Sequence, residues 1–438
     1  MSGIEIAAAS IGAMLVLIYS GMHVSIALML LSFLGVWMLR DNFQIASNMM
    51  VLAFKDSISD YLFGVVPLFV FMGLLVAVAG IGRDTFEVAA QLFRKILGGL
   101  GIATVAANAV FAAITGISIA SAAVFTKVAV PEMMRHGYSG RFSVGVVAGS
   151  SVLGMLIPPS LLFILYGVLT EQSVGSLFIA GVIPGILLSV VYCVGIMLLA
   201  RFASGFVGSS VSQQTDEPED MSMLEMLIKI FPIVLLIALV LGGIYGGVFT
   251  PTEAGAAGAL GALIISLAKR RLTWTSFWQV LVQTGHTTAS ICFLIIGASL
   301  YSRMLSMSGM PGVLGTWVVD SGLGPTGIIL LLIMVIMLLG TILDSASIML
   351  LTLPIALPIL MAAQVDLIWL GVLVVIAVEI GLLTPPFGIA VYVIKATLGP
   401  DSDVTLGEIF IGAAPFALMM LCVLILVFLF PWLATALV

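Results

Sequence analysis

Two short polar motifs are the parts of this chain best suited to binding a small ion. Residues 115–121 read TGISIAS and residues 340–345 read GTILDS, and both interrupt long apolar stretches. Sodium, like calcium and magnesium, prefers hard oxygen donors, and glycine lets the backbone approach a ligand closely. The candidate ion-coordinating residues are Gly116, Ser118, Ser150, Ser151 and Gly154 in the first half, and Gly340, Thr341, Asp344, Ser345 and Thr384 in the second.

Each polar motif is followed by a proline pair, Pro158–Pro159 in the first half and Pro385–Pro386 in the second. Proline has no N–H and clashes with the preceding turn, so two in a row break a helix and free its carbonyl groups. Lipid cannot satisfy such groups, which are tolerated only beside protein or a watery cavity. Freed carbonyls and half-helix C-termini can bind a cation, and half-helix N-termini can meet a carboxylate. A packing kink is the alternative explanation of a single pair.

The spacing of these features repeats. From Ser118 to Pro158 is 40 positions, and from Ser345 to Pro385 is also 40. The spans that flank the two motifs have opposite orientations in the topology we expect. The sequence therefore predicts an inverted repeat, with one polar hairpin tip and one broken span in each half, and this makes a kink formed only for packing the weaker interpretation.

The composition requires that much of the surface meets lipid. The chain has 438 residues, 62% hydrophobic and 8% charged, with a mean hydropathy of +1.30, whereas a soluble protein has roughly 25% charged residues. We predict an all-α polytopic membrane protein with about ten transmembrane helices and two re-entrant helical hairpins, at about 98–134 and 325–362. The expected spans, at about 20 apolar residues each, are 4–20, 22–39, 62–81, 142–170, 177–200, 225–248, 252–268, 285–305, 366–397 and 407–435.

The polar stretch 209–222 is the one obvious linker, and it separates a first half at 1–208 from a second half at 223–438. Lys and Arg concentrate in cytoplasmic loops. Their distribution here places the linker in the cytoplasm and both termini on the periplasmic side. Two amphipathic stretches, about 42–60 and 272–284, are expected to form interfacial helices.

Four charged residues are candidates for binding or gating. Asp344 is a carboxylate at membrane depth, which is a functional candidate by default, although it could also cap a half-helix. Glu253 follows Thr250 in a capping-box pattern, which favours a structural role. Arg303 could pair with Glu253 or meet a substrate carboxylate. Glu379 could form a buried ion pair or carry a proton.

Other classes of protein find less support. No Walker A pattern, catalytic constellation, metal-binding Cys/His spacing or basic run is present, so we expect no enzyme activity, no cofactor, no metal beyond sodium and no nucleic-acid partner. A channel would need polar residues along a whole pore, whereas the polar groups here gather at two points.

The chain resembles the large membrane (M) subunit of the tripartite ATP-independent periplasmic (TRAP) transporters over nearly its whole length. The segments that carry the resemblance are VAVPEMMRHGYSGRFSVGVVAGSSVLGMLIPPSLLFILYGVLTEQSVGSLFIAGVIPG (128–185), GGIYGGVFTPTEAGAAGALGAL (242–263), LGTILDSASIMLLTLPIALPI (339–359) and GLLTPPFGIAVYVIKA (381–396).

This resemblance implies an elevator-type, sodium-driven symporter in the bacterial cytoplasmic (inner) membrane. It also implies two partners, a small membrane (Q) subunit and a periplasmic substrate-binding protein. The substrates it implies are small organic anions, namely dicarboxylates, sugar acids, sialic acid or keto acids. A proton-coupled organic-anion symporter is the alternative, and an anion channel is a weaker one.

Overall fold

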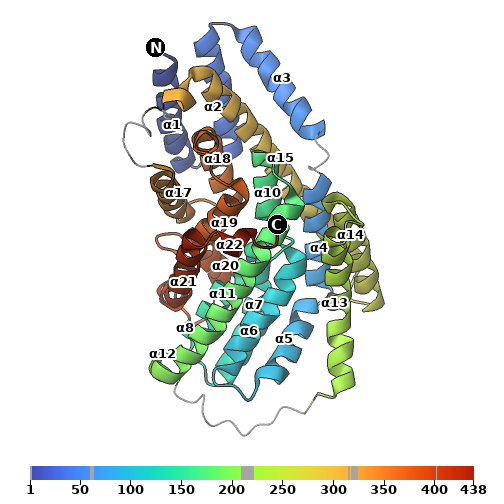
Figure 1. Cartoon of the computed structure of the whole chain (residues 1–438). Coiled ribbons are helices and arrows are strands. Elements are labelled where there is room, and N and C mark those ends of the chain that lie inside the picture. Colours follow the sequence, from blue (N-terminus) through green and yellow to red (C-terminus); the bar gives the residue numbers. More distant parts are fainter. Residues whose placement is uncertain (1, 60–63, 209–220, 314–315, 317–323, 401) are drawn as a thin grey trace.

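The computed structural model describes residues 2–59, 64–208, 221–313, 316, 324–400 and 402–438, and every regular element in these ranges is a helix (Figure 1). Apolar runs fold this way because lipid offers no hydrogen-bond partners, so backbone groups must be satisfied within each segment. The predicted linker at 209–222 falls almost wholly outside the described residues. Its last residue, Ser222, caps the helix that follows.

One group of helices, called the frame here, takes the upper and right-hand parts of Figure 1. Its members pack on one another mainly through the long helix α15, which contacts α1, α2, α3 and α4, and through α14, which contacts α4 and α13. The frame consists of α1 (Gly3–Tyr19), α2 (Val24–Arg40), α3 (Phe43–Ser59), α4 (Val65–Val78), α13 (Met223–Tyr245), α14 (Pro251–Ala268) and α15 (Trp274–Ser308).

The other large group, called the core group here, contains both polar motifs and both proline pairs. Its helices are α6 (Gly99–Thr115), α7 (Ser118–Arg135), α8 (Gly140–Ser151), α9 (Leu153–Leu156), α10 (Leu161–Thr170), α11 (Val174–Phe202), α17 (Gly324–Gly340), α18 (Ser345–Ala362), α19 (Leu367–Leu383), α20 (Ile389–Leu398) and α21 (Leu406–Leu429). Three further helices are α5 (Ile81–Phe93), α12 (Ser204–Val207) and α22 (Trp432–Thr435).

Among the described helices, seven spans are long and apolar enough to cross a membrane, or eight if the bent pair α4–α5 counts as one. One of these spans, Gly140–Thr170, runs through α8, α9 and α10. The all-helical, multi-span class is thereby confirmed. The number of ten spans stays a prediction, because several of the expected segments are apolar helices of only 10–17 residues, including α1, α2 and α19.

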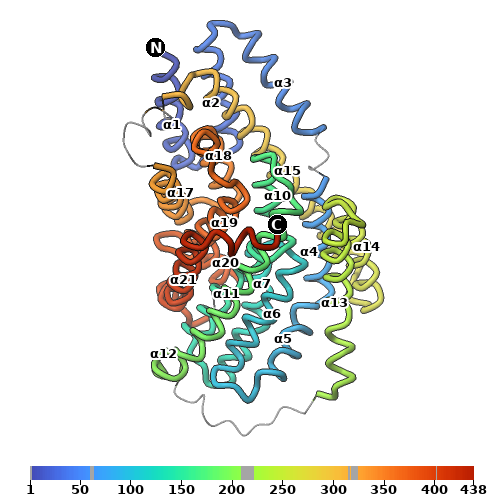
Figure 2. Tube along the Cα trace, viewed as in Figure 1, coloured from blue at the N-terminus to red at the C-terminus, as the bar shows by residue number. Residues whose placement is uncertain are grey.

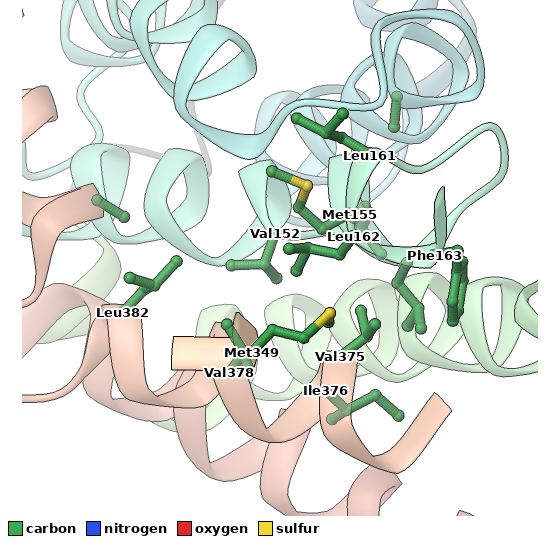
Figure 3. Packing of buried hydrophobic residues seen from close by; sticks show 14 of the residues in the cluster. Val152, Met155, Leu161, Leu162, Phe163, Met349, Val375, Ile376, Val378 and Leu382 are labelled. Atoms are coloured by element: carbon green, nitrogen blue, oxygen red, sulfur yellow. The ribbon is translucent and has the colours of Figure 1, made fainter. Parts of the chain in front are cut away.

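The two halves of the chain meet in a tightly packed apolar interior. Figure 3 shows Val152, Met155 and Leu162 of the first broken span facing Met349 and Val378 of the second half. All five side chains are at most 4% exposed. Helix α10 contacts both α18 and α19, so burial of this apolar surface holds the two broken spans side by side.

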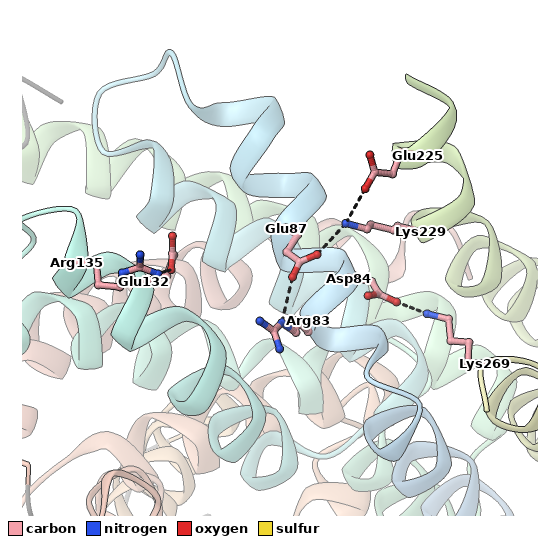
Figure 4. A network of polar contacts seen from close by, with 8 residues as sticks. All are labelled: Arg83, Asp84, Glu87, Glu132, Arg135, Glu225, Lys229 and Lys269. Atoms are coloured by element: carbon pink, nitrogen blue, oxygen red, sulfur yellow. Dashed lines mark hydrogen bonds and ion pairs between the residues drawn. The ribbon is translucent and has the colours of Figure 1, made fainter. Parts of the chain in front are cut away.

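Helix α5 joins the frame to the core group. It follows α4 after a 61° bend at Ala79–Gly80, where Gly80 has a φ of 70°, and it packs on α6, α7 and α13. Figure 4 shows two lysines of the frame reaching its carboxylates. Lys229 Nζ lies 2.9 Å from Glu87 Oε2, and Lys269 pairs with Asp84.

The structure differs from the sequence-based expectation around α15. The expected interfacial helix 272–284 and the expected span 285–305 form one continuous helix of 35 residues, which Figure 2 shows running obliquely from beside α4 to beside α2. The polar residues between them suggested a boundary. They include no proline, and a lone Gly285 costs a helix only about 1 kcal/mol, so nothing ends the helix there.

Candidate functional site

The tip of the first hairpin is locked to the first proline break by its backbone. Helices α6 and α7 are joined at Gly116, which has a φ of 61°. A Cβ atom there would lie 2.4 Å from the carbonyl oxygen of Pro159, so the position requires glycine. The backbone N–H of Leu161, just after the break, donates to the Gly116 carbonyl at 3.2 Å.

The second hairpin repeats this contact. The carbonyl of Thr341, at the tip between α17 and α18, accepts hydrogen bonds of 3.2 Å from the backbone N–H groups of Phe387 and Gly388. Leu161 and Gly388 stand at the same place in the two halves, three residues after the first proline of each pair. In each half, therefore, a hairpin tip is bonded to the backbone that follows a proline break.

A glycine before each break allows the close approach. Gly154 and Gly381 both stand four residues before the first proline of their pair. A Cβ atom on Gly154 would lie 3.2 Å from the backbone of Ser118, and one on Gly381 would lie 2.5 Å from Cα of Gly340. The candidate ion-coordinating residues of each half thus lie around one hairpin tip and one break.

The breaks themselves release backbone groups. Helix α9 ends at Leu156 and α10 begins at Leu161, with Ser160 as its N-cap. Helix α19 ends at Leu383 and α20 begins at Ile389. The peptide bonds Pro158–Pro159 and Pro385–Pro386 are both cis. The prolines that follow α9 and α19 have no N–H to donate to the last carbonyls of these helices. Some of these carbonyls have other partners, since Met155 accepts from the Ser160 hydroxyl and Gly381 from the Thr384 N–H. The remaining ones can face a cation.

Most of the candidate hydroxyls already have partners. Ser151 donates to the Ala148 carbonyl at 2.8 Å, Thr341 to the Leu338 carbonyl at 2.8 Å, and Thr384 to the Ile380 carbonyl at 2.7 Å. A hydroxyl oxygen that donates to its own helix keeps its lone pairs, so these residues can still coordinate a cation.

Ser150 belongs to a buried network that the sequence analysis missed. Its Oγ atom donates to the Val146 carbonyl at 2.7 Å and accepts from Asn108 Nδ2 at 2.6 Å. Asn108 in turn accepts from the Ser121 hydroxyl at 2.6 Å. Asn108 therefore ties both arms of the first hairpin to α8. The available signal was a single amide inside the apolar run of α6.

Asp344 is the N-cap of α18, as its residue type allowed. Its Oδ2 atom accepts from the backbone N–H of Ser347 at 3.2 Å, and its Oδ1 atom accepts from the Ser347 hydroxyl at 2.5 Å. The side chain is half-buried at the tip. The capping interpretation is confirmed, and a carboxylate that caps with one lone pair of each oxygen can also face a cation.

Glu379 lies between the two hairpins rather than beside one of them. It is on α19 and 1% exposed. Its Oε1 atom accepts a 3.3 Å hydrogen bond from Ser345, the first residue of α18. The hydroxyl of Ser118, the first residue of α7, lies near the same carboxylate and has no hydrogen-bond partner.

Arg303 and Glu253 belong to the frame and do not pair. Arg303 Nη2 lies 2.7 Å from Oδ2 of Asp56 on α3, which corrects the suggested pairing with Glu253. The Glu253 carboxylate closes a capping box with Thr250, whose backbone N–H donates to it at 2.8 Å. The Thr-Pro-Thr-Glu pattern predicted the capping box between Glu253 and Thr250. Nothing in the sequence indicated that α3 meets α15 at Asp56.

A cavity of about 400 Å³ lies where the frame meets the core group. Its walls come from α3 and α15 on one side and from the C-terminal end of α10 and the middle of α18 on the other. Arg303, Asp56 and Glu171 are its charged lining residues. Arg303 is therefore placed where a ligand between the two groups would meet it.

Two polar hairpin tips bonded to two broken helices, inside an all-helical multi-span chain, define the class of membrane transport proteins built on discontinuous helices. The chain belongs to the family described as "Tripartite ATP-independent periplasmic transporter, DctM component", whose profile matches residues 11–433. The family resemblance inferred from the sequence is thereby confirmed.

Several characterised proteins resemble the chain over most of its length. The C4-dicarboxylate TRAP transporter large permease protein DctM of Pseudomonas aeruginosa is 35% identical over 373 residues, which is 85% of each chain. The sialic acid TRAP transporter large permease protein SiaM of Vibrio cholerae is 30% identical, over 84% of this chain and 83% of that protein. The isethionate TRAP transporter permease protein DctMQ of Oleidesulfovibrio alaskensis is 29% identical over 77% of this chain and 52% of that protein.

A solved structure shares the fold. The Alcanivorax borkumensis YdaH transporter, whose crystal structure revealed an unusual topology, superposes with a TM-score of 0.64 over 91% of this chain and 90% of that one. The two sequences are only 13% identical. The likeness therefore concerns the fold alone.

Proposed function

We propose that this chain is the transport subunit of a sodium-coupled, binding-protein-dependent importer of small organic anions that works by an elevator mechanism. The observation that carries the proposal is the repeated bond between a hairpin tip and the backbone after a proline break, at Gly116–Leu161 and Thr341–Gly388. A loop that closes over freed backbone in each half of a transporter is an arrangement suited to ion binding and release.

The donors around both tips fit sodium. Each half offers carbonyls released at a break together with the hydroxyls of Ser118, Ser151, Thr341 or Thr384, and these are neutral hard oxygens. Asp344 adds one negative charge, which a bound cation would neutralise. Residues Gly154 and Gly381 bring the backbone of the broken span against each tip.

Small carboxylates are the proposed substrates. The relatives transport C4-dicarboxylates, sialic acid and isethionate according to their names, and all three are small organic anions. In this chain the N-termini of α7 and α18 at the tips supply partial positive charge toward such a ligand. Arg303, which lines the cavity, can offer a full positive charge when its ion pair with Asp56 opens.

The proposed movement is that of the core group against the frame. Helix α4 packs on α14 and α15 of the frame, while α5 packs on α6 and α7 of the first hairpin. The bend of 61° at Gly80 lies between them. A glycine at a bend between two bodies is a common hinge element. We also propose that 1–208 and 223–438 are inverted-repeat halves, with 209–222 as a cytoplasmic linker.

The partners proposed are a small membrane (Q) subunit and a periplasmic substrate-binding protein. The family description names a tripartite transporter, and DctMQ is the name of a relative that is about twice the length matched here. The location proposed is the bacterial cytoplasmic (inner) membrane, with both termini periplasmic.

Reconstitution tests the whole proposal. The chain, its small subunit and the loaded binding protein are placed in proteoliposomes, and uptake of candidate organic acids is measured under inward sodium, potassium or proton gradients. We expect uptake only with sodium, and none by this chain alone. Uptake driven equally well by a proton gradient without sodium would indicate a proton symporter. Passive uptake that follows the membrane potential alone would indicate an anion channel.

A further inference from the structure

The carboxylate of Glu379 lies near the first residue of the second arm of each hairpin. Ser345 begins α18 and Ser118 begins α7, so their two hydroxyls come from opposite halves of the chain. More than 200 positions separate them along the chain, so no local pattern connects them. The fold places one carboxylate, on α19, within reach of both.

The two contacts are unequal in this conformation. Ser345 donates to Glu379 Oε1 at 3.3 Å, which is a long hydrogen bond. Glu379 Oε2 and Ser118 Oγ are both without a hydrogen-bond partner, although each belongs to a residue only 1% exposed. Within the described ranges, no lysine or arginine pairs with Glu379.

Leaving a buried hydrogen-bond donor and a buried acceptor without partners costs free energy. The arrangement in which Ser118 and Glu379 Oε2 stay unbonded is therefore disfavoured. A hydrogen bond from Ser118 Oγ to Glu379 Oε2 would satisfy both atoms at once. The N-termini of α7 and α18 also carry partial positive charge toward the carboxylate, which supports an anion at this place. The structure shows the arrangement in which Ser345 alone is bonded, and the same carboxylate has a free acceptor for Ser118.

We propose that Glu379 is a positioning residue that couples the two hairpins, so that ion binding at one tip favours ion binding at the other. The coupling acts through the hydroxyls of Ser118 and Ser345, which share one acceptor. When a bound ion fixes one hairpin tip, the serine of that hairpin holds the Glu379 carboxylate in place. The carboxylate is then positioned to accept from the serine of the other hairpin. Coupling between two binding sites is reciprocal, so either tip can bind first. This proposal rests on the proposed sodium coupling.

The groups around Glu379 give the coupling no competing charge. Helix α17, which packs on α19, is apolar, and the ionisable residues on the other helices that pack against α19 are engaged elsewhere or are phenols and thiols. They are Asp344, which caps α18, Lys395, which donates to the Ser402 and Val404 carbonyls, Glu408, which closes a capping box, Arg201 in the last turn of α11, whose guanidinium lies over the Phe202 ring, and Tyr166, Tyr192, Tyr392, Cys193 and Cys422.

The test compares single and combined variants of the reconstituted transporter at one fixed pH. Sodium-dependent uptake is measured for the unmodified protein and for Ser118→Ala, Ser345→Ala and Glu379→Met. Each change should raise the sodium concentration for half-maximal uptake about fivefold or more and should lower the Hill coefficient toward about 1. Glu379→Gln retains an acceptor for one serine and a donor for the other, so it should keep much of the cooperativity.

The coupling itself is read from combined variants. In the Glu379→Met background, neither serine substitution should change the Hill coefficient further, because the shared acceptor is gone. A change in the sodium concentration for half-maximal uptake alone would reflect the loss of the serine oxygen as a sodium ligand. Ser143→Ala is the matched control, since Ser143 is equally buried and donates only to the Ser139 carbonyl of its own helix. It should leave the Hill coefficient unchanged.

Two results would overturn the proposal. One is an unchanged Hill coefficient in both serine variants. The other is a further fall in the Hill coefficient when either serine substitution is added to Glu379→Met. If the unmodified protein shows no sodium dependence, the proposed function fails. The coupling between the two hairpins is then tested by the melting temperatures of the same variants. Additive shifts in melting temperature would refute the coupling, and non-additive shifts would support it.

Discussion

Gly340 and Gly381 meet backbone to backbone where α17 packs on α19. A Cβ atom on Gly340 would lie 2.7 Å from Cα of Gly381, and one on Gly381 would lie 2.5 Å from Cα of Gly340. No flexible side chain is available to move aside. This contact places the second hairpin tip directly on the helix that carries Glu379 and the second proline break.

Gly381→Ala should therefore damage both stability and transport. Overpacking of this kind typically costs about 1–3 kcal/mol, and relief requires the tip to move away from the break. Gly285→Ala is the control, because Gly285 lies in the interior of α15 with no atom within 4 Å of an added Cβ. It should be neutral or stabilising by about 1 kcal/mol. The two variants are compared by thermal unfolding in detergent and by uptake in proteoliposomes. Equal melting temperatures and equal uptake for Gly381→Ala and Gly285→Ala would contradict the packing argument.

Asp344→Asn separates charge from capping. Asparagine is as good an N-cap as aspartate, so α18 should remain intact while the negative charge at the tip is lost. We expect a higher sodium concentration for half-maximal uptake, with unchanged expression and partner assembly. Asp344→Ala also removes the cap and should in addition lower the melting temperature. If Asp344→Asn shows the sodium dependence of the unmodified protein, Asp344 is a helix cap and nothing more.

Lys269→Ala should destabilise the protein through Asp84. The pair is largely shielded, with side chains 22% and 12% exposed, and removing one partner of a buried pair costs about 3–5 kcal/mol, less where water still reaches it. Arg135→Ala is the comparison, since Arg135 pairs with Glu132 while 78% exposed, and exposed pairs contribute about 0–1 kcal/mol. In the double variant Lys269→Ala with Asp84→Ala, part of the lost stability should return.

Arg303 can be tested apart from the pair that it forms. Arg303→Gln should raise the substrate concentration needed for half-maximal uptake about tenfold, if its guanidinium meets the substrate carboxylate. Asp56→Asn frees Arg303 without removing it, so it should keep or improve substrate affinity. If both substitutions impair uptake to the same extent, the bond between α3 and α15 is what matters, and Arg303 is structural.

The expected orientation is open to labelling. Single cysteines in 211–219, introduced after Cys193, Cys292 and Cys422 are replaced by alanine, should react with membrane-impermeant reagents only from the cytoplasmic side. The reason is the concentration of Lys and Arg in the loops expected on that side. Labelling of intact cells from the periplasm would reverse the topology.

Local chemistry explains what the sequence could predict. The hairpins were expected at about 98–134 and 325–362 and are formed by Gly99–Arg135 and Gly324–Ala362, because polar residues inside an apolar run and the prolines behind them are local signals. The Glu253 capping box was likewise encoded within four residues.

Contacts between distant segments were not accessible in this way. The meeting of Ser118 and Ser345 at Glu379, the pairing of Arg303 with Asp56 and the role of Asn108 all depend on how helices from different halves pack. Periodicity indicates which residues are apolar but not which helix covers them. The length of α15 was mispredicted for a local reason. Its polar middle resembled a helix end, but it contains no residue that stops a helix.

The 35 residues of α15 amount to about 52 Å of helix at 1.5 Å per residue, whereas the hydrocarbon layer of a bilayer is about 30 Å thick. The helix must therefore cross at a steep slant or extend into the headgroups. Trp274 and Trp278 at its start, 77% and 59% exposed, suit the headgroup level. The thickness of the surrounding lipid thus bears on the tilt of α15, the helix on which the frame is assembled. Reconstitution in thinner and thicker bilayers should change the transport rate even though no residue has changed.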